Sequence, residues 1–533
     1  MTADPTPAPP PPARMPRQIP FIIANEGCER FSFYGMRNIL VAFLATSVMM
    51  AHLPEARREP EAKAVLHTFM MGVYFFPLIG GWLADRFFGK YRTTFWLSLV
   101  YVGGHALLAV SETSKSGFYG GLLLIAIGSG GIKPLVASFV GDQFDQTNKH
   151  LARVVFDAFY WMINVGSFFA SVFMPRLLRD AGPSWAFGIP GVLMLVATVV
   201  LWSGRKRYVM VPPSPADPHS FLRVVWTALT TPAAGRFNLG LLVAVVAVAG
   251  ALPLAVAAIG SLALGDQTWL IAYKPVVKAC LALVLVLAGV CGGAALQLDR
   301  ARARHPAVAV DGVRAVLRVL IVFALVTPFW SLFDQKASTW VIQAGGMAKP
   351  SWFEPAQMQA LNPTLVLLLI PFNNLVVYPA LARRGIVPTT LGKMTLGMAL
   401  AGVAYVIVGA MQVAMDEGAH LSITWQILPY VFLTAGEVLV SATGLEFAYS
   451  QAPLAMKGVI MAFWSLAVTV GNLWVLLADE TVKRDALIGP IADTGLTPVA
   501  FLMFFFAGFA FLSAVGFRIY AGRYRMVDNY RTD

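Results

Sequence analysis

Apolar residues fall into long runs along almost the whole chain, and short polar gaps separate these runs. A helix needs about 20 mainly apolar residues to cross the hydrocarbon core of a bilayer. The pattern therefore predicts about fourteen membrane-spanning helices. We expect them near 19–49, 62–86, 93–112, 117–141, 152–175, 185–203, 237–263, 269–297, 313–336, 358–382, 387–414, 422–451, 455–479 and 495–520.

Positively charged residues gather in every second gap and in the C-terminal segment. They are Arg86, Lys90, Arg92, Lys149, Arg153, Arg205, Lys206, Arg207, Arg223, Arg236, Arg300, Arg302, Arg304, Arg383, Arg384, Arg518, Arg523, Arg525 and Arg531. The other gaps hold fewer cations, although the first of them contains Arg57, Arg58 and Lys63. Because loops rich in Lys and Arg remain in the cytoplasm, we expect both termini on the cytoplasmic side, consistent with an even number of spans.

The longest gap, which is rich in proline, divides the chain into two halves, and the two spans after it predict a lipid-facing insert. The predicted fold class is an all-α polytopic membrane protein: two six-helix bundles plus a two-helix insert. We expect a disordered cytoplasmic tail (1–18), an N-terminal bundle (19–204), a cytoplasmic linker (205–236), the inserted helix pair (237–297), a second cytoplasmic linker (298–312), a C-terminal bundle (313–522) and a cytoplasmic tail (523–533).

Composition excludes several classes of protein. The chain is 57% hydrophobic and 13% charged, whereas soluble domains carry about 25% charged residues. The net charge of +12 does not indicate nucleic-acid binding, because the cations lie in the gaps and not on one basic face. Cys28, Cys280 and Cys291 lie inside apolar runs, and their spacing predicts no metal site and no disulfide framework.

The first span carries ionisable residues on one helical face. Glu26, Glu29, Arg30, Tyr34 and Arg37 follow offsets of 0, 3, 4, 8 and 11. Charged residues at membrane depth are costly and by default indicate a functional site. A carboxylate beside a cation stays ionised, and it takes up a proton more readily when the cation is drawn away. This face is therefore our candidate for proton coupling.

Further polar groups occur in the other spans of the first half. His67 and Tyr74 share one face, and His67 is either a proton relay or an ordinary helix–helix hydrogen bond. Lys133 follows a glycine-rich stretch and is a candidate partner for Glu29 or Glu26. Asn164 lies one turn from Tyr160, and interhelical hydrogen bonding is its alternative role. Asp85 and Arg86 lie at the cytoplasmic interface together with Lys90, so we expect a structural gate there.

The second half supplies deep carboxylates. Its candidate site residues are Trp330, Asp334, Asn362, Glu437, Ser441 and Trp464. Apart from Glu26 and Glu29, which have cations close by, the deep carboxylates Asp334 and Glu437 come from this half, whereas the deep cations come from the first half. A cavity between such walls suits a small zwitterion, such as a short peptide.

Several segments resemble the proton-coupled oligopeptide transporter family (POT/PTR) of the major facilitator superfamily. Glu26 to Phe31 matches the ExxER motif of the family, and Gly81 to Lys90 is similar to the cytoplasmic-loop motif of the superfamily. The segments 156–167, 330–335 and 437–451 also resemble family signatures. The resemblance spans both halves and implies the major facilitator fold. The insert, and the absence of a large extracellular domain after 387–414, resemble bacterial members.

The resemblance also implies roles for single residues. Arg30 and Lys133 would hold the peptide carboxylate, and Glu437 the amino terminus. Asn164 and Asn362 would contact the peptide backbone, while Tyr34, Tyr74, Trp330 and Trp464 would shape the side-chain pockets. Ser441 completes this peptide-binding set.

The same resemblance implies that Glu26 and Glu29 couple protons, with Glu29 salt-bridged to Lys133. His67 stands where animal members have a proton-linked histidine. Arg37 and Asp334 would form a bridge that closes the extracellular side. Phe33 departs from the family, because it replaces the first tyrosine of the usual Tyr-Tyr pair.

The expected function is proton-coupled import of di- and tripeptides by alternating access, and not enzymatic catalysis. We expect no cofactor beyond the proton, and we expect peptide-like drugs and the lipid bilayer as further partners. The expected location is a bacterial inner membrane, with the monomer as the functional unit. One alternative is a nitrate or drug carrier on the same scaffold, and Glu437 argues against an anion. A membrane receptor or scaffold lacks support from any sizeable soluble domain. A membrane enzyme lacks a metal-ligand or nucleophile cluster.

Overall fold

The computed structural model describes residues 15–144, 148–213, 217–232, 237–263, 274–451, 456–483 and 485–526. The helices of the first half are α1 (Ile19–Thr46), α2 (Glu55–Leu83), α3 (Lys90–Val110), α4 (Lys115–Ser129), α5 (Lys133–Gly141), α6 (Lys149–Ala181) and α7 (Pro183–Ser203). Between the halves lie α8 (Phe221–Thr230), α9 (Leu239–Ala263) and α10 (Pro275–Leu296). The second half contains α11 (Ala307–Asp334), α12 (Thr339–Gly345), α13 (Leu361–Phe372), α14 (Tyr378–Arg383), α15 (Thr390–Asp416), α16 (Ile427–Glu437), α17 (Thr443–Gln451), α18 (Lys457–Val482), α19 (Asp485–Ala492) and α20 (Pro498–Arg523).

Shorter helical segments join or interrupt these helices. The 3-10 turns are η1 (Val48–Met50), η3 (Leu298–Ala303), η4 (Gln335–Ala337), η5 (Pro355–Ala360) and η7 (Ile423–Gln426). The π-helical segments are η2 (Ala84–Phe88), η6 (Asn373–Val377) and η8 (Val438–Ala442). Because π-segments often mark functional positions, it is notable that η8 begins directly after Glu437.

The observed helices account for the predicted spans. Among the described residues, twelve helical stretches are long and apolar enough to cross a membrane. Two predicted spans fall outside that set for physical reasons. The span near 19–49 is α1, whose four buried charges lower its hydropathy. The span near 117–141 is divided into α4 and α5, because the chain leaves helical geometry between Gly130 and Ile132.

The segment expected to be the linker 205–236 contains a helix, α8, which the sequence pattern did not predict. Its buried face consists of Phe221, Val224, Val225, Ala228 and Leu229. This face belongs to the apolar core of the second half, together with Leu298 and Ala301 of η3. The linker is therefore anchored to the second half. Residues 1–14 and 527–533 of the expected tails lie outside the described residues.

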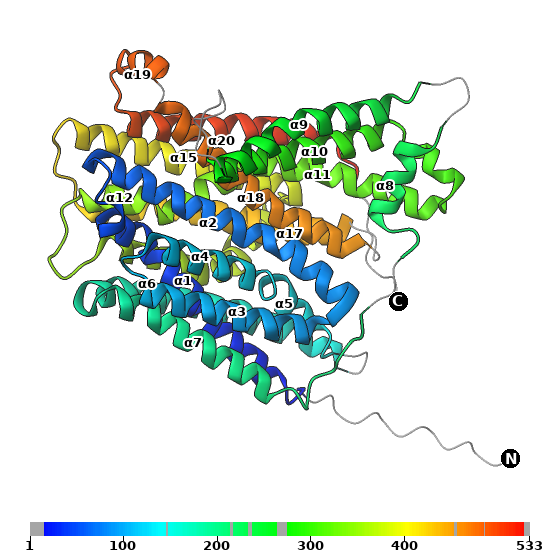
Figure 1. Ribbon diagram of the computed structural model, residues 1–533, viewed down its shortest axis with the longest axis horizontal. Helices are drawn as coiled ribbons and strands as arrows, with labels where there is room; N and C mark the ends of the chain where they lie inside the picture. Colours follow the sequence, from blue (N-terminus) through cyan, green and yellow to red (C-terminus); the bar gives the residue numbers. More distant parts are fainter. Residues whose placement is uncertain are drawn as a thin grey trace.

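The two halves lie side by side, with the helices running along one common direction (Figure 1). Helices α2 and α18 pack against each other at the boundary between the halves. The insert contributes to the same contact, because Val277 and Cys280 of α10 share a small apolar core with Met71 of α2 and Leu473 of α18. Helix α9 pairs with α10 on its outer side and is largely exposed. The fold thus brings α1, α2, α11 and α18 together at its centre.

Helices α2 and α4 approach each other closely at a pair of glycines. A Cβ atom on Gly80 would lie 2.0 Å from the carbonyl oxygen of Gly130. A Cβ on Gly130 would likewise lie 2.7 Å from the carbonyl oxygen of Phe76. Only glycine fits at these two positions. The close contact holds in place the interruption between α4 and α5, which directly precedes Lys133.

Substitution of Gly80 by alanine is expected to destabilise the protein by about 1–3 kcal/mol, because the added methyl group overpacks a backbone contact. Gly81→Ala is the matched control, since nothing lies within 4 Å of its Cβ position. Thermal unfolding of the detergent-solubilised variants measures the difference. Equal unfolding temperatures for the two variants would contradict the close α2–α4 contact.

Candidate functional site

The charged face of α1 forms one compact ion cluster. Arg30 Nε lies 2.6 Å from Glu26 Oε1 and 2.8 Å from Glu29 Oε2. All three side chains are buried. The spacing of four residues places Glu26 and Arg30 on the same face, as the sequence pattern indicated. Two carboxylates therefore share one guanidinium, and any group that draws Arg30 away leaves two buried negative charges close together.

The structure corrects the expected partner of Lys133. Glu29 is paired with Arg30 and does not form the salt bridge with Lys133. The Lys133 ammonium instead lies 4.0 Å from the ring centre of Phe33 and 4.2 Å from that of Tyr74. Arg30 already occupies the carboxylates, and aromatic faces attract a cation at these distances. Phe33, the departure from the family motif, thus contributes to holding Lys133.

A buried chain of polar contacts joins the halves. Arg37 Nη2 donates to Asp334 Oδ1 at 2.8 Å, and both side chains are buried. Asn472 Nδ2 donates to the other oxygen of Asp334 at 2.7 Å. His67 Nδ1 lies 2.7 Å from Asn472 Oδ1, and its Nε2 lies 2.9 Å from Ser338 Oγ. These hydrogen bonds therefore connect α1 through α11 and α18 to α2.

These hydrogen bonds indicate which ring nitrogen of His67 carries a proton. A carboxylate accepts hydrogen bonds, so the amide NH2 group of Asn472 must face Asp334. The amide oxygen then faces His67 and requires a donor, which assigns a proton to Nδ1. Its Nε2 lies within hydrogen-bond distance of Ser338 Oγ, which can also donate to the carbonyl oxygen of Gln335. His67 thus makes hydrogen bonds between helices, and one ring nitrogen remains able to take a proton.

The opposite wall is built around Glu437. Asn362 Nδ2 donates to Glu437 Oε2 at 2.5 Å and to Thr434 Oγ1 at 3.1 Å. Lys336 Nζ donates to Asn362 Oδ1 at 2.7 Å and lies 3.2 Å from the ring centre of Phe333. The sequence pattern did not indicate Lys336, which is a buried cation of the second half. The expected asymmetry between a positive and a negative wall is therefore incomplete.

The aromatic candidates lie at two places. The rings of Trp330 and Trp464 meet edge to face, with centres 5.8 Å apart. Tyr34 packs edge to face on Phe33. Asn164 donates to the carbonyl oxygen of Tyr160 in its own helix at 3.0 Å, so this bond does not link two helices.

The two walls face each other across the halves. Helix α6, which carries Tyr160 and Asn164, packs against α13 of the second half, which carries Asn362. Tyr160 is 41% exposed, and Lys133, Glu437 and Ser441 are partly exposed. These side chains are therefore not sealed by protein. The arrangement offers cations and a carboxylate to one small molecule.

The predicted cytoplasmic gate residues are exposed at the end of α2, in η2. A carboxylate oxygen of Asp85 lies 3.8 Å from the position of a Cβ on Gly458, in the first turn of α18. A carboxylate at a helix N-terminus is stabilised by the helix dipole. We expected Asp85, Arg86 and Lys90 to form one cluster. For Lys90 this expectation is wrong, because Lys90 is paired with Asp142 at 2.7 Å.

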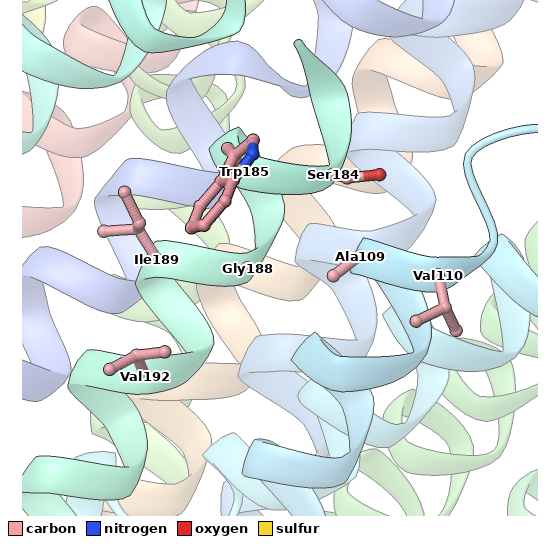
Figure 2. Close-up of a pocket in the computed structure, with 7 residues that line it drawn as sticks. All are labelled: Ala109, Val110, Ser184, Trp185, Gly188, Ile189 and Val192. Carbon is pink, nitrogen blue, oxygen red and sulfur yellow. The ribbon is translucent and has the colours of Figure 1, made fainter. Parts of the chain in front are cut away.

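A pocket of about 430 Å³ lies elsewhere, between the end of α3 and the start of α7. Figure 2 shows its lining, which includes Val110, Trp185 and Val192. It shares no residue with the charged cluster, and apolar side chains dominate its wall. We therefore do not consider it a site for a polar substrate.

Comparisons with known proteins agree with this architecture. Solute carrier family 15 member 2 of Homo sapiens is 32% identical over 450 residues, which are 81% of this chain and 54% of the relative. Peptide transporter family 1 of Drosophila melanogaster is 33% identical over 428 residues, 77% of this chain and 49% of that protein. The chain thus spans about half the length of these curated relatives.

Solved structures match over nearly the full length. The crystal structure of an auto inhibited POT family peptide transporter has a TM-score of 0.92 and 62% identity, and covers 97% of this chain and 99% of its own. A proton dependent oligopeptide (POT) family transporter has a TM-score of 0.80 and 57% identity, with coverage of 94% and 100%. The family model described as PTR2, POT family, matches residues 91–488. With the ion cluster of α1 and this agreement over both halves, the chain belongs to the POT family.

Proposed function

We propose that this protein is a proton-coupled symporter that imports di- and tripeptides by alternating access. The observation that supports this most is the placement of Arg30 and Lys133 on one half and Glu437 on the other, in a chain of the POT family. A short peptide carries a carboxylate at one end and an amine at the other, so it complements both walls.

In this proposal, Arg30 and Lys133 bind the peptide carboxylate, and Glu437 binds the amino terminus. Asn362 hydrogen-bonds Glu437 and Lys336. It positions the carboxylate for the amine, and it contacts the peptide backbone together with Asn164. Trp330, Trp464, Tyr34 and Tyr74 line the side-chain pockets, and Ser441 lies one turn beyond Glu437.

Proton coupling follows from the shared guanidinium. Arg30 is the counter-ion that Glu26 and Glu29 share in the absence of substrate. A peptide carboxylate competes for Arg30, and the two glutamates are then left without a counter-ion, which favours protonation of one of them. Peptide and proton therefore bind cooperatively, and this coupling is reciprocal. His67 is a second group that can take a proton.

We further propose that both termini are cytoplasmic and that the protein resides in a bacterial inner membrane. The basic gaps support this orientation. The functional unit is the monomer, with bundles at 19–204 and 313–522 and the insert at 237–297. Its only coupling partner is the proton, and peptide-like drugs are further substrates.

A substrate comparison separates this function from its alternatives. We expect a dipeptide, but neither nitrate nor an N-acetylated dipeptide, to compete with labelled dipeptide for uptake into proteoliposomes. Nitrate lacks the amine, and acetylation removes the charge that pairs with Glu437. Uptake of nitrate in place of peptide would support the anion carrier.

Replacement of Arg37 or Asp334 by alanine is expected to shift the resting population toward the outward-open state. Each substitution leaves a buried charge without its partner, which costs about 3–5 kcal/mol. Accessibility of introduced cysteines to labelling from the two faces of the membrane measures the shift.

Arg179→Ala is the matched control, because it breaks the more exposed Arg179–Glu354 pair between the same two halves. An exposed ion pair contributes about 0–1 kcal/mol, so labelling should change little. Unchanged labelling in both Arg37→Ala and Asp334→Ala would show that the buried pair is not a gate.

A further inference from the structure

A cavity of about 910 Å³ lies between α8, α9 and the segment that precedes α11. It is remote from the charged cluster of α1 and has no residue in common with it. Figure 1 shows α8 beside the ends of α9, α10 and α11. One wall is α9, from Leu241 to Leu252. This wall is about 16 Å long at 1.5 Å per residue, roughly half the thickness of the hydrocarbon core.

The outer face of α8 forms the second wall. Its inner face is buried in the core of the second half, yet Leu222 and Trp226, one turn apart, are 74% and 68% exposed. Both line the cavity. Tryptophan favours the level of the lipid headgroups, where its ring is half apolar and half polar. The groove therefore runs from the interface along an apolar helix.

Two arginines, Arg223 of α8 and Arg304 after η3, line the groove and are exposed. Within the part of the chain that the structure describes, no carboxylate forms an ion pair with either of them. Their neighbours differ, because Arg302 and Arg314 are both paired with Asp299 and Asp311. The charges of the groove are thus free to bind an anion.

A hydrogen bond of His305 connects the segment that carries Arg304 to α8, the helix that carries Arg223. His305 Nδ1 lies 2.9 Å from His219 Nδ1, and its Nε2 lies 2.9 Å from Thr227 Oγ1 of α8. Burial lowers the pKa of His305, and the charges of His219, Arg223 and Arg304 lower it further, against a smaller opposing effect of Asp217. The lowered pKa favours the neutral form of His305, so Arg223 and Arg304 carry the positive charge at the mouth of the groove.

We propose that this groove binds an anionic phospholipid of the surrounding membrane, with the phosphate between Arg223 and Arg304 and an acyl chain along α9. The groove combines an apolar wall at membrane depth with unpaired cations at one end, and this pattern complements an amphiphile with a negative headgroup. Such a lipid contacts α8, α9 and the segment that precedes α11 together. It would fasten the insert to the second half.

Native mass spectrometry of the purified full chain, equilibrated with phosphatidylglycerol or phosphatidylcholine, tests the headgroup. We expect wild type to retain phosphatidylglycerol preferentially. Each interfacial cation contributes about fivefold to affinity, so Arg223→Gln/Arg304→Gln should reduce this retention by about tenfold or more. Arg383→Gln/Arg384→Gln removes the same charge from exposed positions outside the groove and should retain the lipid. Equal retention by both double variants would overturn the proposal, as would equal retention of both lipids by wild type.

A second variant tests the acyl chain. Ala249 is exposed and lines the groove, so Ala249→Trp fills it without touching the core. We expect weaker retention of phosphatidylglycerol with an unchanged unfolding temperature in detergent. Wild-type retention by this variant would exclude the groove as the location. A dimer of the wild-type chain that Ala249→Trp abolishes would show that a second copy, and not a lipid, occupies the groove.

Discussion

Glu437→Gln is expected to lower the uptake of ordinary dipeptides by roughly 10- to 100-fold at low substrate concentration. The change preserves shape and removes the charge that binds the peptide amine, and a hydrogen bond to a charged group contributes about 1.5–3 kcal/mol. Asn362 still finds an acceptor in the glutamine, so the fold should be retained. Uptake by proteoliposomes measures the loss.

Glu446→Gln is the matched control, because Glu446 lies in α17 of the same span and is exposed. It should transport as wild type does. The discrimination between a dipeptide and its N-acetylated form gives a second readout, which should shrink in Glu437→Gln. Normal dipeptide uptake with full discrimination in this variant would remove Glu437 from the amine site.

Glu26→Gln and Glu29→Gln are each expected to abolish the concentration of peptide against its gradient. A membrane potential of 100 mV supplies about 2.3 kcal/mol per charge, which corresponds to roughly 50-fold accumulation for each coupled proton. Each variant leaves one carboxylate beside Arg30, and this carboxylate stays ionised because it no longer shares the guanidinium. The accumulation ratio should therefore fall to about one. Peptide counterflow requires no net proton movement and should survive in at least one variant.

Glu55→Gln is the control for these variants, because Glu55 is exposed at the start of α2. It should accumulate peptide at the wild-type level. If Glu26→Gln and Glu29→Gln both did so as well, the carboxylates of α1 would be structural. The proton would then have to pass through His67 or Asp334.

Periodicity predicted most of the charged cluster. The spacing of Glu26, Glu29 and Arg30 determines a shared helical face whatever the rest of the chain does. The identity of the partners could not be predicted in the same way. Lys133 belongs to another helix, and its contact with Phe33 and Tyr74 depends on the break between α4 and α5.

Two parts of the structure were missed although the sequence carries a signal for them. Lys336 comes two residues after Asp334, at the end of a long apolar run, where a lysine is ordinarily expected at the water interface. The chain continues into η4 and keeps Lys336 buried. Helix α8 has apolar residues at offsets 0, 3, 4 and 7 from Phe221. We did not predict α8 because it is only 10 residues long and prolines surround it.

The proposed function requires that the movement of protons drives the import of peptide. Proteoliposomes containing the wild-type chain, loaded with buffer and given labelled dipeptide outside, test it with and without an inward proton gradient. We predict that the internal peptide concentration exceeds the external one only when the gradient is present, and that a proton ionophore abolishes the excess. Equal internal concentrations with and without the gradient would contradict proton-coupled symport.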